Sequence, residues 1–117
     1  MPEVGRLATR ESVRPAYHLY VVVLRTEELS RSRDEILDAL QKENIGVGVH
    51  FRALHLQPFY RETYGFQPGQ LPVAEHATDR ILSLPVYPAM TDRDVADTIA
   101  AVTKVISHSR RSTLAAR

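Results

Sequence analysis

Residues 45–52 alternate between two kinds of side chain. The odd-numbered residues are apolar: Ile45, Val47, Val49 and Phe51. The residues between them are glycine or polar: Gly46, Gly48, His50 and Arg52. Because successive side chains of a β-strand point to opposite faces, this pattern predicts a strand with one face in the core. Glycine inside a strand commonly marks close approach by another backbone or by a ligand. The other face, where His50 and Arg52 follow two glycines, is therefore a candidate binding surface.

Two further stretches are predicted to be extended. Tyr17–Leu24 is aromatic and β-branched on both faces, which is typical of a strand in the middle of a sheet. Tyr17 and Tyr20 are accordingly expected in the core. Leu82–Pro88 contains two prolines, which favour a position at the edge or the end of a sheet.

Three helices carry start signals. Ser32 opens a capping box, so a helix is expected from Arg33 to about Glu43. Pro72 suits the first turn of a second helix that stays in register to Ile81, and Thr91 caps a third that ends near residue 107. The order strand, helix, strand, loop, helix, short strand, helix predicts an α+β fold, a small antiparallel or mixed sheet with helices packed on it.

The connection from residue 53 to residue 70 is long and rich in aromatic side chains, with room for one helical turn near residues 59–63. Loops of this length inside compact domains are usually functional or disordered, and the aromatic content argues against disorder. The sequence as a whole predicts three parts: a flexible lead-in at residues 1–15, a folded domain at residues 16–108 and a disordered basic tail at residues 109–117.

The composition excludes several classes of function. The chain has 117 residues, a net charge of +1 and no cysteine. Disulfides, thiolate zinc sites and cysteine nucleophiles are therefore excluded, and the small net charge argues against nucleic-acid binding. The longest apolar stretch is too short to cross a bilayer, so no membrane association is expected. The first residues lack the apolar segment of a secretory signal, and a cytoplasmic location is expected.

Motifs of common active sites are missing. Ser30 and Ser32 fall at helix caps and further serines lie in the tail, and the chain has no Gly-x-Ser-x-Gly turn, no glycine-rich phosphate loop and no dinucleotide fingerprint. A metal site built from His50, His55 and His76 with Glu75 is geometrically conceivable, although nothing in their spacing requires it.

Residues 50–60 combine several recognition groups. They offer an arginine fork, two imidazoles, an amide and aromatic rings within eleven residues. This mixture suits an anionic, polyhydroxylated ligand. The alternative is that His50 and Arg52 only tie the loop to the domain by hydrogen bonds, and the residue types alone support both interpretations equally.

Four segments in one order resemble a known family. The segments are Tyr17–Val22, Gly46–Arg52, His55–Tyr60 and Ser83–Thr91. Together they resemble the C-terminal small domain of the DegT/DnrJ/StrS sugar aminotransferases, and within that family the UDP-4-amino-4-deoxy-L-arabinose–oxoglutarate aminotransferase type. The resemblance runs from about Pro15 to Ser107.

This resemblance implies the small domain of a fold-type I aminotransferase. In the family, pyridoxal phosphate (PLP) is bound as a Schiff base to a lysine of a large N-terminal domain. An amino group then passes from glutamate to a keto sugar nucleotide, often for lipopolysaccharide or other surface polysaccharides. The enzymes are homodimers with active sites at the subunit interface. The small domain closes one side of the cleft, and the resemblance places His50 and Arg52 on the substrate side, followed by His55 and Gln57.

The cofactor-binding parts of the family have no counterpart in this sequence. The lysine, the aspartate that pairs with the pyridine nitrogen and the phosphate-binding loop belong to the large domain, and neither Lys42 nor Lys104 resembles the cofactor lysine in its context. The chain alone is therefore expected to bind no PLP and to hold no catalytic residues. It is interpreted as the small domain of a PLP-dependent sugar aminotransferase, produced separately or from a truncated gene. The alternative is a free-standing, non-catalytic module that binds a sugar nucleotide or another protein.

Overall fold

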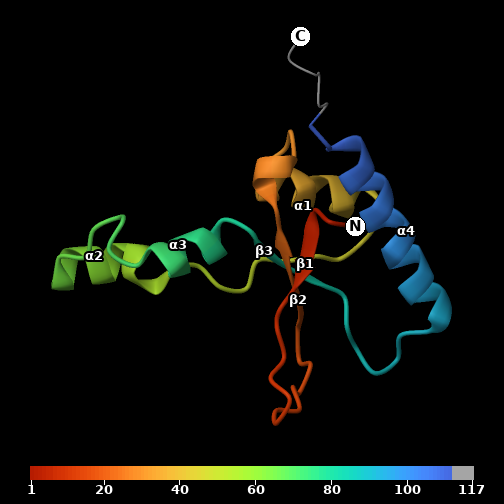
Figure 1. Cartoon of the computed structure of the whole chain (residues 1–117), viewed down its shortest axis with the longest axis horizontal. Coiled ribbons are helices and arrows are strands. Elements are labelled where there is room, and N and C mark those ends of the chain that lie inside the picture. Colours follow the sequence, from red (N-terminus) through yellow and green to blue (C-terminus); the bar gives the residue numbers. More distant parts are fainter. Residues whose placement is uncertain (112–117) are drawn as a thin grey trace.

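A three-stranded antiparallel sheet lies at the centre of the computed structural model, which describes residues 1–111. The strands follow the order β1 (Val4–Arg6), β2 (Tyr20–Leu24) and β3 (Ile81–Leu84), as Figure 1 shows. The three valines of β2 suit a strand with neighbours on both sides. The predicted central strand is confirmed, and so is the α+β class with a small antiparallel sheet.

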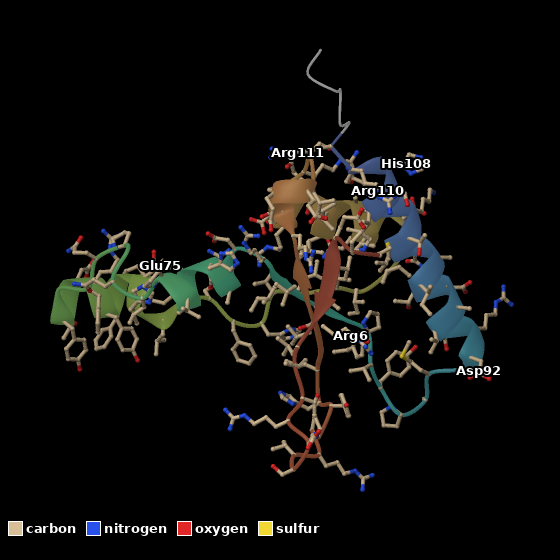
Figure 2. The ribbon with its side chains drawn as sticks, viewed as in Figure 1. Arg6, Glu75, Asp92, His108, Arg110 and Arg111 are labelled. Atoms are coloured by element: carbon tan, nitrogen blue, oxygen red, sulfur yellow. The ribbon has the colours of Figure 1, made fainter. Side chains whose placement is uncertain are left out.

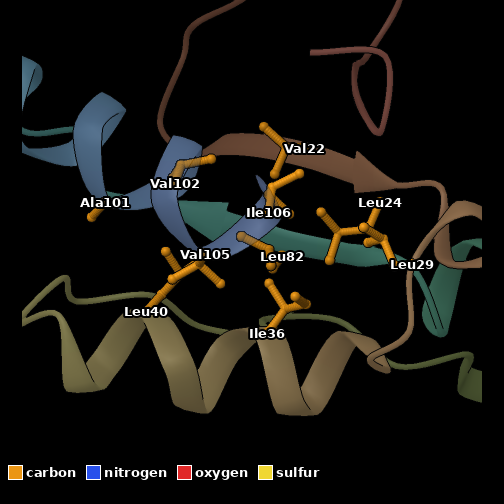
Figure 3. Packing of buried hydrophobic residues seen from close by; sticks show 10 residues of the cluster. All are labelled: Val22, Leu24, Leu29, Ile36, Leu40, Leu82, Ala101, Val102, Val105 and Ile106. Carbon is orange, nitrogen blue, oxygen red and sulfur yellow. The ribbon is translucent and has the colours of Figure 1, made fainter. Parts of the chain in front are cut away.

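Two amphipathic helices cover one face of this sheet. They are α1 (Arg33–Lys42) and α4 (Asp92–His108), and each begins with a capping box, Ser32 with Glu35 and Thr91 with Asp94. Figure 3 shows how both helices and the sheet share one core, whose buried side chains are Val22, Leu24, Leu29, Ile36, Leu40, Leu82, Ala101, Val102, Val105 and Ile106. No helix within residues 1–111 is long and apolar enough to cross a membrane.

Residues 53–80, called the arm below, extend away from the sheet (Figure 1). The arm contains the 3-10 helix η2 (Leu54–Leu56) and the helices α2 (Pro58–Tyr64) and α3 (Pro72–Thr78). A proline in the first turn starts each of the two α-helices, and Gly65 ends α2 in the left-handed region, with φ of 72°. The helix predicted to reach Ile81 is shorter than expected, because Ile81 already belongs to β3.

The prediction of a strand at residues 45–52 is wrong, because Gly48 is the one residue of this segment that pairs with the sheet. Gly48 exchanges two backbone hydrogen bonds with Ser83, of 3.3 and 2.9 Å, at the outer edge of β3. The ladder cannot continue on either side. Two residues after Ser83, Pro85 has no N–H to donate. Two residues before it, the carbonyl of Ile81 accepts from Arg33 Nη1 at 2.8 Å.

The predicted alternation therefore holds on only one side of this bridge. Ile45 and Val47 pack against the core as predicted. Phe51, predicted on the core face, is 59% exposed because the chain has left the sheet by that point. Tyr17 and Tyr20, also predicted in the core, are 58% and 38% exposed, because Tyr17 precedes β2 and Tyr20 is only its first residue.

The predicted lead-in contains a strand. β1 pairs with β2, and three residues are too few to show a period in the sequence. Just before β1, the carboxylate of Glu3 is buried and forms an ion pair with Arg110, whose Nε lies 2.6 Å from Glu3 Oε1. This pair joins the first strand to the end of α4, so the expectation of a flexible segment is wrong at residues 3–6.

The chain is also attached beyond α4, where a disordered tail was expected. Ser109 is fully buried and its hydroxyl donates to the carbonyl of Val105 at 2.7 Å. Arg111 Nε donates to the carbonyl of Leu29 at 2.7 Å. These bonds correct the expectation for residues 109–111, and residues 112–117 lie outside the described part of the chain.

Truncation of the core should destabilise the whole domain. Ile36 is 0% exposed between α1 and the sheet. Ile36→Ala is expected to lower the free energy of unfolding by about 2–5 kcal/mol, because a cavity adds to the lost apolar burial. Ile99→Ala on the outer side of α4, 60% exposed, is the matched control and should stay within about 0.5 kcal/mol. Urea denaturation followed by circular dichroism measures both, and equal effects would contradict the placement of Ile36.

Candidate functional site

A groove of about 420 Å³ lies beside the outer edge of β3. It is bordered by three segments: His18 and Leu19, Gly46 to Gly48 with His50, and Ser83 to Tyr87. A Cβ atom at Gly46 would meet no other atom within 4 Å, so the absent side chain leaves open space in this border. The polar side chains at the groove are two imidazoles, one hydroxyl and one phenol.

Ser83 holds the imidazole of His50 at this groove. His50 Nδ1 lies 3.0 Å from Ser83 Oγ. The backbone of Ser83 is paired on both sides, with Val21 of β2 and with Gly48, so its hydroxyl has a defined position. The imidazole lies over Gly48, where an added Cβ atom would come within 3.3 Å of His50 Cε1. The glycine that was expected to permit a close approach does so for a side chain of the same chain.

The structure separates the four residues predicted to bind substrate. Only His50 borders the groove. Arg52 is exposed and makes no ion pair among residues 1–111. His55 is 4% exposed inside the arm, and Gln57 is half-buried at the N-cap of α2. A substrate role for the last two remains a prediction from the family resemblance.

Three groove residues were missed by sequence reasoning: His18, Ser83 and Tyr87. All three lie within the segments that carried the resemblance, yet no spacing connects them to His50. Ser83 comes 33 residues after the histidine that it contacts. The resemblance was the only available signal, because chain topology rather than local pattern brings these groups together.

A larger cavity of about 540 Å³ adjoins the groove and shares Gly46, Pro85 and Tyr87 with it. Its far side is formed by α4 and includes Lys104. The ammonium of Lys104 donates to both carboxylate oxygens of Glu43, at 2.8 Å each. This cation is therefore already engaged in an ion pair that connects α4 to the end of α1.

The carboxylate of Glu75 organises the arm from within, and Figure 2 shows it between α2 and α3. Glu75 Oε1 lies 2.9 Å from His55 Nε2, the N–H of Gly69 donates to both oxygens at 2.8 and 2.9 Å, and the N–H of Leu71 donates at 3.3 Å. The hydrogen bond from His55, followed by that from Gly69, holds the pKa of Glu75 below its ordinary value of 4.5. His55 thus anchors the loop of the arm.

No three histidine or acidic side chains gather within residues 1–111 in an arrangement that could hold a metal ion. His50 lies at the groove, whereas His55 and Glu75 bond each other inside the arm. The metal site considered from the sequence is therefore not assembled.

One family model and two relatives match most of this chain. The model of the DegT/DnrJ/EryC1/StrS aminotransferase family matches residues 1–103. An uncharacterized protein of Methanocaldococcus jannaschii is 45% identical over 101 residues, which are 86% of this chain and 26% of that protein. The spore coat polysaccharide biosynthesis protein SpsC of Bacillus subtilis is 40% identical over 94 residues, which are 80% of this chain and 24% of SpsC.

A solved structure gives the same result for the fold. The PLP form of Spr1654 from Streptococcus pneumoniae matches with a TM-score of 0.78 at 26% identity, over 91% of this chain and 27% of Spr1654. The chain thus spans about a quarter of the length of the proteins that it matches.

Acid should loosen the arm through Glu75. A carboxylate with a lowered pKa in the folded state stabilises that state above its unfolded-state pKa, and this stabilisation is lost as the pH falls below about 4.5. The amides of Gly69 and Leu71 are expected to lose protection at that pH, measured against the exchange rate of an unprotected amide at the same pH. In Glu75→Gln they should exchange fast at neutral pH as well, while the exposed control Glu62→Gln behaves as the unaltered chain does. Hydrogen exchange followed by NMR measures this, and unchanged amides in Glu75→Gln would contradict the role of the carboxylate.

Proposed function

This chain belongs to the DegT/DnrJ/EryC1/StrS aminotransferase family, and we propose that it is the small domain of an enzyme that transfers an amino group from glutamate to a keto sugar nucleotide. The product would serve lipopolysaccharide or other surface polysaccharide synthesis, in the cytoplasm. The similarity to SpsC, a spore coat polysaccharide biosynthesis protein, supports the polysaccharide part of this proposal. The large domain and a second subunit are the proposed partners.

The groove beside β3 is the observation that carries the proposal. It lies on the segment Gly46–Arg52, one of the four that carried the family resemblance. Its border offers His18, His50 and Tyr87, which suit hydrogen bonds to the hydroxyl groups of a sugar. The groove is open on one side, as expected for one wall of a cleft that another domain completes.

His50 is proposed to orient the substrate. Its Nδ1 is engaged by Ser83 Oγ, and its Nε2 has no hydrogen-bond partner within residues 1–111, which leaves that atom for a ligand hydroxyl. Arg52, two residues farther, carries an exposed guanidinium that suits the phosphates of a nucleotide. Neither residue is proposed to form or break a bond of the reaction.

The residues of this chain do not fit a PLP site of their own. PLP needs a lysine whose ammonium is available, but Lys104 is held by Glu43 and Lys42 is exposed at the end of α1. Neither lysine borders the groove of His50. The cofactor is therefore proposed to belong to the large domain, and no step of the reaction is assigned to this chain.

A free-standing binding module is the second candidate, and the same groove supports it. Such a module would keep the recognition surface without any cofactor chemistry. The coding sequence upstream separates the two candidates, because a large domain with its lysine in the same reading frame would support the enzyme.

The 117-residue chain is expected to retain no PLP. After incubation with PLP and removal of the excess by gel filtration, the protein fraction should show no cofactor absorption band, because Lys104 is held by Glu43 and Lys42 is exposed at the end of α1. The matched control is full-length Spr1654, whose solved structure is a PLP form, treated in the same way. A stable band together with turnover of glutamate would contradict the assignment of the cofactor to another domain.

Loss of the proposed substrate contacts should affect the sugar substrate alone. In a full-length enzyme that carries this domain, His50→Ala and Arg52→Ala are each expected to lower kcat/KM for the sugar nucleotide more than tenfold, about 1.4 kcal/mol. The half-reaction with glutamate should be unchanged. Arg93→Ala, on the exposed side of α4, is the matched control. Unchanged kinetics for both variants would return these side chains to a purely structural role.

A further inference from the structure

The arm exposes large apolar side chains over most of its length. Five of them are between 47% and 83% exposed: Leu54, Phe59, Tyr64, Leu71 and Val73. The rings of α2 contact one another, Phe59 with Tyr60 at 5.3 Å and Tyr60 with Tyr64 at 6.0 Å between centroids. Figure 2 shows ring side chains along one side of α2 with no other part of the chain over them. A contiguous apolar surface of this kind is unusual on a soluble protein unless something covers it.

The shape of this surface is nevertheless well defined. Four hydrogen bonds to the Glu75 carboxylate hold the loop between α2 and α3. At the base of the arm, Arg33 Nη1 donates to the carbonyl of Thr78 at 3.1 Å. An apolar surface that is ordered before it meets a partner loses less conformational entropy on binding. These polar contacts therefore suit a preformed docking surface.

We propose that the apolar side of α2 docks onto the large domain, the part of the related proteins that lies outside the matched quarter; this inference rests on the proposed function. The matched proteins are about four times as long as the segment that aligns with this chain. The match to Spr1654 covers 91% of this chain, so most residues of the arm, residues 53–80, have an aligned counterpart there. Full-length relatives thus keep an arm that has no cover within this chain, and their additional residues supply the apolar partner.

The sides of α2 differ in a way that indicates how it docks. Phe59, Tyr60 and Tyr64 share one side of the helix, while Glu62 lies on the opposite side and is exposed. An apolar centre with charged residues at its border is the usual composition of a protein interface. The aromatic side is therefore the one that meets the large domain, and Glu62 remains in solvent.

Hydrogen exchange in two contexts tests the proposal. The first sample is the 117-residue chain, and the second is a chimera in which residues 1–103 of this chain replace the matching quarter of SpsC. Backbone amides of residues 54–64 are expected to exchange at least tenfold more slowly in the chimera. Phe59→Ser with Tyr64→Ser should remove this protection, whereas Glu62→Ser, the matched control on the other side of α2, should keep it. If the chimera is insoluble, grafting only residues 53–80 into SpsC gives the same comparison.

Equal exchange rates in the two contexts would overturn the proposal. So would a concentration-dependent increase in the sedimentation coefficient of the 117-residue chain that Phe59→Ser with Tyr64→Ser abolishes, because the partner would then be a second copy. Transamination is measured on the same chimera. A protected arm without activity supports docking and counts against the proposed function, and an active chimera with an unprotected arm does the reverse.

Discussion

One buried guanidinium, that of Arg33, joins the three parts of the molecule. Arg33 is the first residue of α1 and is 7% exposed. Its Nη1 donates to the carbonyls of Thr78 at 3.1 Å and Ile81 at 2.8 Å, and its Nε donates to Asp34 at 2.6 Å. Because a buried charge without partners is costly, these contacts are needed for the native state. Helix α1, the end of the arm and the start of β3 are therefore held at one point.

The site depends on this arrangement at the edge of β3. The carbonyl of Ile81 already accepts a hydrogen bond from Arg33, and Pro85 has no N–H to donate. Ser83 is therefore the residue of β3 that pairs with the segment around Gly48. The chain leaves the sheet after that single bridge. This departure exposes Phe51, leaves the His50 ring against Ser83 at the groove and sends the following residues outward as the arm. A full fourth strand at this edge would have extended the sheet where the chain now departs from it.

The chain presents two surfaces of different chemistry, and neither is complete by itself. The groove is open, and its border combines apolar residues with the hydrogen-bonding groups of His18, His50, Ser83 and Tyr87. The α2 surface is apolar, and the half-buried Glu75 carboxylate orders the loop that follows α2. The chain spans about a quarter of the length of its relatives, and both proposals complete these surfaces with polypeptide outside that quarter.

The amino-acid sequence by itself determined the elements whose signals are local. The capping boxes at Ser32 and Thr91 start α1 and α4, because each box joins residues only three apart. The three consecutive valines of β2 specify a strand that is apolar on both faces, which is typical of a central strand. Only the tertiary structure decided where the strand around Gly48 stops and which residues accompany His50. Those outcomes depend on contacts between Arg33 and Ile81, 48 residues apart, between His50 and Ser83, 33 apart, and between His55 and Glu75, 20 apart. No local pattern reports such pairs, since the fold brings the two partners of each pair together.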